Sequence, residues 1–293
     1  MKNILFILFT VISAPAFTWW YSGHMVVAQI AENHLTARAK FHAEELISLL
    51  ADYYPCSADF ITASCWADDI KNSFLDFSSW HKQLLPYDPT EILSIPQKEQ
   101  LIAKAKEKGL EYGIKRCVTT LKDSTANYYD KGIALRLLIH LVADAHMPLH
   151  CATLYNHHFP NGDRGGTSFA LTEILEEESN LHALWDSCFL LDYYEFKRPL
   201  TINGKRQIEQ IAQEFTLLFP VKSLAEESAD LNANNWIRDS YELAKSVAYQ
   251  GIEPYSAPSP EYMNKGKSVA CRQLTLAGYR LSYLLNEIFE HYK

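Results

Sequence analysis

The sequence predicts an all-α protein with a single mainly helical domain, and three observations lead to this. Glycine is scarce, with 11 residues in a chain of 293, and the alternation typical of half-buried strands is hard to find. Apolar residues instead recur at helical spacing over most of the chain. The length allows one large core or two modest domains, but no repeat, low-complexity tract or long linker divides it. We therefore expect one domain over residues 19–293.

The first eighteen residues are typical of a secretory signal peptide. Lys2 supplies a short positive region, and the apolar stretch 4–12 is too short to span a bilayer as a mature helix. Ala16 and Thr18 are small residues ahead of an expected cleavage before Trp19. We therefore expect residues 1–18 to be removed and the protein to be secreted or periplasmic. An uncleaved anchor is the alternative, which the short apolar stretch disfavours.

Apolar residues three and four positions apart predict each helix in turn. The helices of the first half are expected over 19–51 with a break near Thr36, 58–75, 96–121 and 128–149. Those of the second half are expected over 171–191, 208–219, 223–248 and 260–292. Two prolines make 78–94 a loop, and polar residues make 151–166 another.

Two pairs of histidine and aspartate point to metal chemistry. His140 and Asp144 are four residues apart, and so are His182 and Asp186. On a helix this spacing puts both side chains on one face, one turn apart. Imidazole nitrogen and carboxylate oxygen are ligand types that zinc takes. Two such pairs in one chain make a metal site the first hypothesis.

Proline interrupts the first of these helices. Pro148 lacks an N–H, and its ring crowds the carbonyl of Asp144, so the helix is expected to kink or end there. Either outcome moves His150 away from the helix face that carries His140 and Asp144. A kink would let His150 reach a metal that a straight helix would deny it.

Further candidate ligands precede the two pairs. His24 lies close to Trp19, whose α-amino group would become a nitrogen ligand if cleavage occurs there. Asp68 lies in a candidate helix and shares a face with Lys71, three residues on. His81 follows a tryptophan. Each residue alone is more often a surface or structural residue, but their joint presence favours a metal centre.

The six cysteines leave their pairing open. Export would permit disulfides, six cysteines allow 15 pairings, and Cys56 with Cys65 closes the shortest loop that is easy to propose. No C-x-x-C spacing occurs, so a thiolate zinc site is not expected.

These residues resemble the motifs of the zinc-dependent S1/P1-type nucleases, which are secreted single-strand nucleases and 3′-nucleotidases. The motifs occur in family order from Trp19 to Asp186, and the spacing of nine ligand positions makes the resemblance specific. They are an N-terminal Trp followed by Gly23-His24, Trp66-Ala67-Asp68, Trp80-His81, H-x-x-x-D-x-H-x-P-L-H from His140 to His150, GD-x-GG from Gly162 to Gly166, and NLH-x-x-WD from Asn180 to Asp186.

The resemblance implies three Zn²⁺ ions per chain, in a cleft. The first ion would be held by Asp68, His81, His140 and Asp144. The second would be held by His150, His182 and Asp186. The third would be held by the Trp19 amino and carbonyl groups, His24 and a shared Asp144. His146 is not a ligand in this scheme, because it faces away from Asp144 on a helix.

Catalysis, in this resemblance, would rest on Asp68, Lys71 and Asp144. Two zinc ions sharing a carboxylate lower the pKa of a bridging water, and the resulting hydroxide can attack phosphorus in line. The other zinc can stabilise charge on the leaving 3′ oxygen. Lys71 would place a positive charge next to the phosphate.

Four substrate-binding candidates lie where the chain departs from the family pattern or extends a loop. Lys71 replaces an arginine, so the grip on phosphate would be weaker. Thr167 replaces an asparagine, which removes an amide that could contact substrate. Lys82 replaces an aromatic residue that stacks on a base, an interaction typically worth about 1–3 kcal/mol per base. Tyr155, in a loop that is longer than usual, either supplies a replacement ring or belongs to a merely exposed aromatic turn.

The expected function is therefore an exported zinc phosphodiesterase that cuts single-stranded DNA and RNA to 5′-nucleotides and removes 3′-phosphates from nucleotides. The formal charge is −8, and without Lys2 the mature chain has 26 basic and 35 acidic residues, a charge of −9. Such a surface repels nucleic acid unless bound cations reverse the local field. We expect a monomer with nucleic acid or nucleotides as substrate, no stable membrane association and no obligate protein partner.

Two alternatives stay open. A zinc-dependent phospholipase C resembles this family in fold and in its three-metal site, but usually carries glutamate where Asp186 stands, and the chain lacks a C-terminal β-rich membrane-binding segment. The departure at Lys82 weakens the nucleotide argument. An exported zinc-binding protein without turnover is the second alternative, although such a protein needs no phosphate-directed Lys71.

Overall fold

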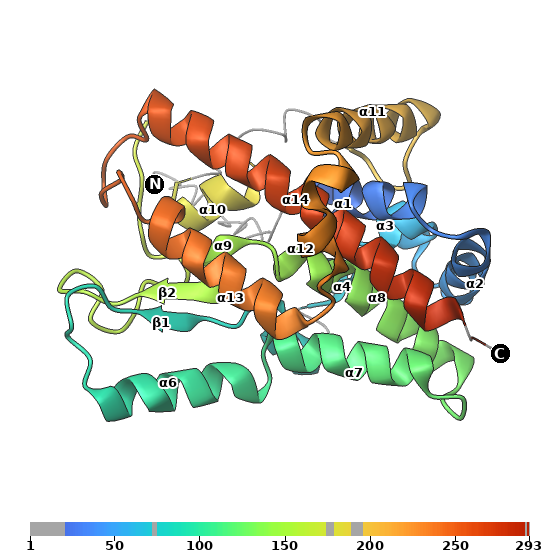
Figure 1. Cartoon of the computed structure of the whole chain (residues 1–293), viewed down its shortest axis with the longest axis horizontal. Helices are drawn as coiled ribbons and strands as arrows, with labels where there is room; N and C mark the ends of the chain where they lie inside the picture. Colours follow the sequence, from blue (N-terminus) through green and yellow to red (C-terminus); the bar gives the residue numbers. More distant parts are fainter. Residues whose placement is uncertain (1–20, 72–74, 174–178, 189–195, 291, 293) are drawn as a thin grey trace, which may run out of the picture.

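The computed structural model describes residues 21–71, 75–173, 179–188, 196–290 and 292. Nearly all of their regular structure is helical, which confirms the predicted all-α class. The longest described helix, α14 (Pro260–Glu290), runs diagonally across the molecule in Figure 1, with α13 (Ala233–Leu243) below its N-terminal half. The expected leader and Trp19 lie outside the described residues.

The first two helices meet at the predicted break. Helix α1 (Tyr21–Asn33) is followed by α2 (Ala37–Ser48), and Thr36 caps α2 because its Oγ1 accepts a hydrogen bond from the amide of Ala39 at 3.1 Å. Helix α1 packs closely on α14. A Cβ added to Gly278 of α14 would lie 2.5 Å from Cγ2 of Ile30, so only glycine allows this approach.

The expected helix over 58–75 is instead a series of short turns. These are η1 (Pro55–Ser57), α3 (Phe60–Ala63) and α4 (Trp66–Ile70), with α5 (Leu75–Ser78) and η2 (Ser79–His81) beyond them. Asp59 and Thr62 form a reciprocal capping box that starts α3 anew. The break between α3 and α4 is at Ser64 and Cys65, where the hydroxyl of Ser64 donates to the carbonyl of Ile61 at 2.6 Å.

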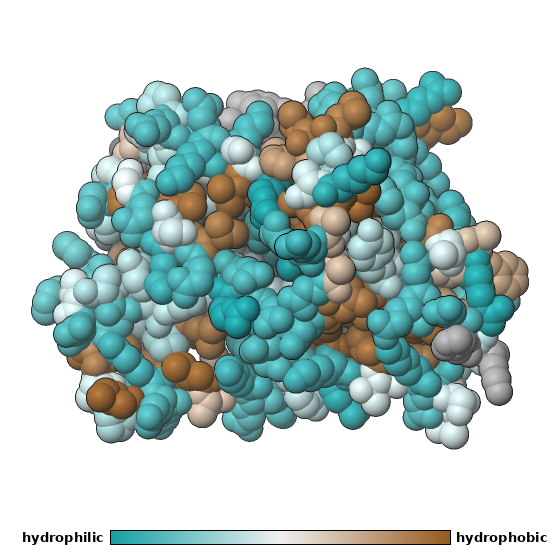
Figure 2. All heavy atoms as spheres, in the orientation of Figure 1, coloured by the Kyte–Doolittle hydropathy of each residue, from teal (hydrophilic) through white to brown (hydrophobic). Residues whose placement is uncertain are grey.

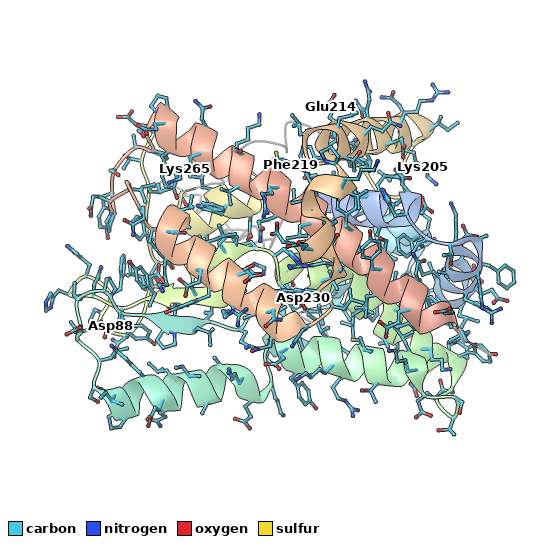
Figure 3. All side chains as sticks on the ribbon, in the orientation of Figure 1. Asp88, Lys205, Glu214, Phe219, Asp230 and Lys265 are labelled. Atoms are coloured by element: carbon cyan, nitrogen blue, oxygen red, sulfur yellow. The ribbon has the colours of Figure 1, made fainter. Side chains whose placement is uncertain are left out.

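The expected helix over 96–121 is also divided. Helix α6 (Ile95–Glu107) ends before Gly109, and α7 (Leu110–Lys122) begins after it. No residue of α6 is buried, whereas α7 contributes several residues to the core. The carboxylate of Asp88, labelled in Figure 3, closes the turn before α6 by accepting hydrogen bonds from the amides of Ile92 and Leu93, both at 3.0 Å.

Two short strands occur where loops were expected. Strand β1 (Leu85–Tyr87) pairs in parallel with β2 (Ala152–Leu154), and Leu85 is opposite Ala152. Just before them, the amide of Gln83 donates to the carbonyl of His150 at 2.8 Å. The pairing therefore holds the chain that follows His81 against the chain that contains His150.

The central helix ends where proline predicts. Helix α8 (Tyr128–Asp144) is buried along most of its length and stops at Asp144. Pro148 then opens the short helix α9 (Pro148–Cys151) at its first position, where a missing N–H costs nothing. The prediction of a helix end among the candidate ligands is confirmed.

The helices of the second half differ from the expected ranges in both directions, since the one expected over 208–219 begins earlier, at Ile202. Only α10 (Leu181–Asp186) forms within 171–191 among the described residues, after an antiparallel bridge between Ala170 and Asn180. Residues 230–232 separate α12 (Ala225–Ala229) from α13, so the expected helix over 223–248 is broken there. The remaining elements are α11 (Ile202–Leu218), η5 (Val221–Leu224) and the π-helical η6 (Ala244–Ala248).

The structure tests the suggested pairing of the cysteines. The structure joins none of the six cysteines by a disulfide; Cys56 is exposed, while Cys65 is buried and its Sγ donates to the carbonyl of Tyr21. The suggested Cys56 to Cys65 bridge is therefore not present.

Figure 2 shows hydrophilic side chains over most of one face, with apolar groups in separate patches. None of the described helices is both long enough and apolar enough to cross a membrane.

Candidate metal centre

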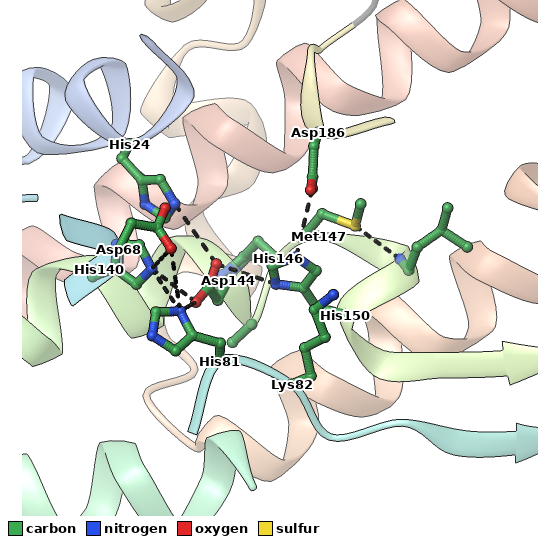
Figure 4. A network of polar contacts seen from close by, with 12 residues as sticks. His24, Asp68, His81, Lys82, His140, Asp144, His146, Met147, His150 and Asp186 are labelled. Carbon is green, nitrogen blue, oxygen red and sulfur yellow. Dashed lines mark hydrogen bonds and ion pairs between the residues drawn. The ribbon is translucent and has the colours of Figure 1, made fainter. Parts of the chain in front are cut away.

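The histidine and aspartate residues singled out in the sequence converge in the interior. They form three groups, two of which share His140. Within each group, one potential ligand atom of each residue lies within 4.8 Å of those of the other residues. The groups are His24 with Asp68 and His140, His81 with His140 and Asp144, and His150 with His182 and Asp186. All these residues are buried. They come from α1, α4, η2, α8, α9 and α10, and Figure 4 shows most of them facing one another.

Four residues, Asp68, His81, His140 and Asp144, form what we call the first cluster. One ligand atom of each has the spacing of a tetrahedral metal site. His81 Nδ1 and His140 Nε2 are 2.9 Å apart, and each lies 3.1 Å from Oδ2 of Asp144 and 3.8 Å from Oδ1 of Asp68. A tetrahedral zinc ion with bonds of about 2.0–2.2 Å separates its ligand atoms by roughly 3.3–3.6 Å. The observed separations lie on both sides of this range, so the four residues fit such an ion.

A second cluster, formed by His150, His182 and Asp186, lies on the other side of Asp144. Asp186 Oδ1 is 3.5 Å from His150 Nε2, and its Oδ2 is 3.1 Å from His182 Nε2. Asp144 Oδ1 lies 3.1 Å from His150 Nδ1. Asp144 thus faces His81 and His140 through Oδ2, and His150 and His24 through Oδ1. A carboxylate placed in this way can be shared between two metals.

His24 extends the first cluster towards α1. Its ring stacks on that of His140 with centroids 3.8 Å apart, and its Nε2 lies 3.7 Å from Asp144 Oδ1. His24 therefore stands near both Asp68 and Asp144. Trp19, which the resemblance places beside His24, lies outside the described residues.

Backbone carbonyls orient two of the histidines. Nδ1 of His140 donates to the carbonyl of Ser64 at 2.7 Å, and Nδ1 of His182 donates to the carbonyl of Gly165 at 2.5 Å. In both rings the proton on Nδ1 leaves the lone pair of Nε2 directed into the cluster. Such outer hydrogen bonds are a regular feature of histidines that bind metals.

Several buried polar atoms of the centre have no hydrogen-bond partner among the described residues. They include both ring nitrogens of His24 and of His150, and both carboxylate oxygens of Asp144 and of Asp186. Buried polar groups in this condition are costly. A cation bound between them would satisfy them together, so the donor set suits a metal ion.

Burial and neighbouring charges shift the pKa values of these groups. Burial lowers the pKa of His24 to about 3, and His140 beside it acts in the same direction. Burial alone would raise the pKa of Asp144, but His140 and His150 outweigh it and hold the pKa well below its usual range. At neutral pH the centre therefore offers ionised carboxylates and at least one neutral imidazole.

Two lysines lie next to the clusters. Nζ of Lys71 is 3.3 Å from Asp68 Oδ1, and Nζ of Lys82 is 2.8 Å from His182 Nε2. Burial lowers the pKa of Lys82, although Asp186 and Asp144 act against this. The two cations thus belong to different clusters, Lys71 to the first and Lys82 to the second.

The other substrate candidates do not face the centre in this way. Tyr155 is buried, with only 8% of its surface exposed, so its ring is not free to stack on a base. Phe159 of the same loop stacks on Phe169. Thr167 donates its hydroxyl to the carbonyl of Arg164 at 3.1 Å. Within residues 155–159 of this loop, the exposed residues are instead His157 and His158.

His146 is engaged elsewhere. Its Nδ1 donates to the carbonyl of Val142 at 2.7 Å, and its Nε2 accepts from the guanidinium of Arg280 at 2.9 Å. Both ring nitrogens therefore have protein partners. Arg280, which lies on α14, was not singled out from the sequence, because nothing local links it to His146.

The fold and the site together define a class of protein, namely a helical protein with buried clusters of histidine and aspartate. Comparison with known proteins makes this specific: the S1/P1 Nuclease family model matches residues 19–290. The chain belongs to the S1/P1 nuclease family and is a hydrolase of the nuclease class, which is metal-dependent and acts on nucleic acid.

Plant relatives cover nearly the whole chain. Endonuclease 4 of Arabidopsis thaliana is 24% identical over 94% of this chain and 90% of its own length. Endonuclease 1 of the same plant is 25% identical over 93% of this chain and 87% of its own length. The similarity therefore extends through the helices that carry both candidate clusters.

Proposed function

We propose that the protein is a zinc-dependent phosphodiesterase that hydrolyses single-stranded DNA and RNA to 5′-nucleotides and removes 3′-phosphates from nucleotides. The observation that carries this proposal is the shared carboxylate of Asp144. Its two oxygens lie 3.1 Å from His140 and from His150, in two clusters with ligand chemistry suited to zinc. Two adjacent cations can stabilise both the attacking and the leaving oxygen of an in-line attack on a phosphate ester.

The proposed ligand sets use the residues of both clusters. Asp68, His81, His140 and Asp144 would hold the first ion, and His150, His182 and Asp186 the second. His24 and Asp144 would hold a third together with the amino and carbonyl groups of Trp19. Zinc bound at these residues supplies a water of lowered pKa and positive charge next to the phosphate.

The protein's own residues then have distinct tasks. Asp68 and Asp144 would stay ionised and hold the charge of the centre in place. The backbone carbonyls of Ser64 and Gly165 would keep His140 and His182 in the tautomer that directs Nε2 inward. Burial of the clusters would strengthen their interaction with a bound phosphate, because little water screens it.

Lys71 and Lys82 are the proposed substrate contacts. Their ammonium groups lie beside different clusters, so a phosphate group positioned between the clusters would meet a positive charge from either side. Thr167 is retained as a weaker candidate. The burial of Tyr155 argues against base stacking by that ring, and recognition would therefore depend on phosphate more than on base.

We further propose that residues 1–18 are a cleaved leader, that the mature domain covers 19–293, and that the protein is a secreted or periplasmic monomer. N-terminal sequencing of exported protein, together with its metal content, tests this. A Trp19 start and three zinc ions per chain are the expected results. An intact leader in the exported protein would contradict the cleavage.

Three substrates test the function. Purified, zinc-loaded protein is expected to hydrolyse single-stranded DNA and a 3′-mononucleotide, and to leave phosphatidylcholine unchanged. The Asp144→Asn variant is the control for contaminating activity. Turnover of the lipid alone would support a phospholipase C, and inactivity of fully metallated protein towards all three would support a zinc-binding protein.

A further inference from the structure

A tight turn connects the two ligand-bearing segments of the second cluster. Within residues 162–166, Gly162, Arg164, Gly165 and Gly166 all have positive φ, between 60° and 83°. A Cβ added to Gly165 would lie 2.4 Å from the carbonyl oxygen of Leu149, the neighbour of His150. The turn is therefore pressed against α9, and its conformation is one that most residues avoid.

The carboxylate of Asp163 fills the inside of this turn. It accepts hydrogen bonds from the amides of Gly165 at 3.1 Å, Gly166 at 3.0 Å and Leu154 at 2.9 Å, and from the hydroxyl of Thr153 at 3.2 Å. One side chain thus fixes the amides that the left-handed backbone turns inward. The same carboxylate ties the turn to β2.

A tyrosine from the C-terminal third of the chain also donates a hydrogen bond to the carboxylate of Asp163. The hydroxyl of Tyr249 lies 2.9 Å and 3.1 Å from the two oxygens of Asp163. Tyr249 directly follows the π-helical turn η6, and its amide donates to the carbonyl of Ala244 at 3.0 Å. Such π-turns are often found near functional sites, and here the turn directs a buried hydroxyl at Asp163.

The fixed turn contacts His182 directly. The Gly165 carbonyl accepts from Nδ1 of His182 at 2.5 Å, and the Gly166 carbonyl accepts from the amide of His182 at 3.3 Å. A path of hydrogen bonds therefore leads from Tyr249 through Asp163 and the turn to the ring that faces Asp186.

We propose that Tyr249 and Asp163 are positioning residues for His182, and through it for the second metal cluster. Neither residue reaches the cluster itself. They act by holding the Gly165 carbonyl where it selects the tautomer and orientation of the His182 ring. This inference rests on the proposed metal binding. It adds Tyr249, which no motif of the chain had indicated, and gives a role to Asp163 of the GD-x-GG motif.

The Tyr249→Phe variant tests the inference, because it removes the hydroxyl and keeps the ring. Zinc affinity is measured by competition with a chromophoric chelator, without substrate. The expected result is that one of the bound zinc ions is held more weakly, by up to about 10-fold, which is the lower end of the effect of losing an outer hydrogen bond to the ligand itself. Tyr241→Phe is the matched control, because that hydroxyl donates to the carbonyl of Pro86 and should leave every affinity unchanged.

A double-mutant comparison assigns the effect to one cluster. In an Asp186→Asn background, which removes a ligand of the second cluster, Tyr249→Phe should have no further effect on the remaining zinc. An equal loss of affinity in that background would overturn the inference, and so would unchanged affinity in the single variant. Thr153→Val, which removes another partner of Asp163, should shift the same zinc ion in the same direction.

These outcomes are separate from the test of the nuclease activity. Protein that binds zinc but hydrolyses no nucleic acid would contradict the proposed function, while weaker zinc binding by Tyr249→Phe would still support the positioning role. Conversely, active protein whose zinc affinity ignores Tyr249 would overturn the positioning role alone.

Discussion

Asp144 Oδ1 lies 3.1 Å from Nδ1 of His150, although the two residues belong to different helices on either side of Pro148. The other oxygen of Asp144 faces His81 and His140 at the same distance. One carboxylate thus stands at the junction of two clusters, and this relationship leads to the first prediction.

Replacing Asp144 should remove more metal than replacing Asp186. In the proposed ligand sets, Asp144→Asn takes a ligand from the first and the third ion, whereas Asp186→Asn takes one from the second ion only. We expect the first variant to lose two or more zinc ions per chain and the second variant to lose one. Elemental analysis after gel filtration measures this. Equal zinc retention by both variants would contradict the shared role of Asp144.

Chelation should destabilise the protein as well as inactivate it. Ligands that come together only in the folded state make zinc binding part of the folding free energy. A free zinc concentration 100 times the dissociation constant of one site adds about 2.7 kcal/mol. Thermal denaturation with and without chelator checks this. A melting temperature that does not fall when zinc is removed would argue against any contribution of zinc to folding.

Neutralising the two lysines should weaken phosphate binding. Lys71→Gln and Lys82→Gln each remove a cation beside one cluster, and charge-assisted hydrogen bonds typically contribute about 1.5–3 kcal/mol. We expect inhibition by inorganic phosphate to weaken about 10-fold or more in each variant. Lys115→Gln on the surface of α7, where the lysine pairs with Glu111, is the control. Unchanged inhibition in both cluster variants would remove the lysines from the substrate site.

An extra residue before Trp19 should impair the third proposed zinc site. The additional peptide bond would convert the α-amino group into an amide, which is a poor metal ligand. We expect such a protein to lose one zinc ion per chain while the clusters around Asp144 stay loaded. Comparing the zinc content of proteins that begin at Trp19 and one residue earlier measures this. Full zinc content in the extended protein would refute N-terminal ligation.

Asp88 should stabilise the protein in a pH-dependent way. Partial burial would raise the pKa of Asp88, but the amide of Leu93 and the ammonium of Lys98 outweigh it and lower the pKa. A lowered pKa means that the stabilisation is complete above about pH 4, the unfolded value, and is lost as the pH falls through the folded value.

The Asp88→Asn variant measures this contribution. We expect it to cost about 1–2 kcal/mol at pH 6 and progressively less below about pH 4, in urea unfolding of chelator-treated protein. Asp52→Asn, at an exposed position, is the control for loss of a surface charge. A destabilisation that does not change between pH 6 and pH 3 would contradict the charge-based origin.

Local signals in the sequence predicted those parts of the fold and site that depend on neighbours in the chain. Thr36 lies at the break between α1 and α2, and Pro148 follows the end of α8, because capping and the missing N–H act within a few residues. The four-residue spacing of His140 and Asp144 places them together for the same reason.

Features that depend on distant residues were not predictable in this way. Tyr249 meets Asp163 across 86 positions of the chain, and no periodicity connects them. Strands β1 and β2 have three residues each, too few for an alternating pattern to show. The burial of Tyr155 likewise follows from the packing of the turn over it, since a Cβ added to Gly162 would lie 3.0 Å from that ring.

The close crossing of α1 and α14 has a consequence for the whole molecule. His24 reaches the centre only if α1 is seated where it is, and α1 is seated against Gly278, where it leaves no room for a side chain. The position of α1, and with it that of His24, therefore depends on packing against α14. The metal centre forms only when both helices are present. A partly synthesised protein would lack the surface on which its own earliest candidate ligand takes its place.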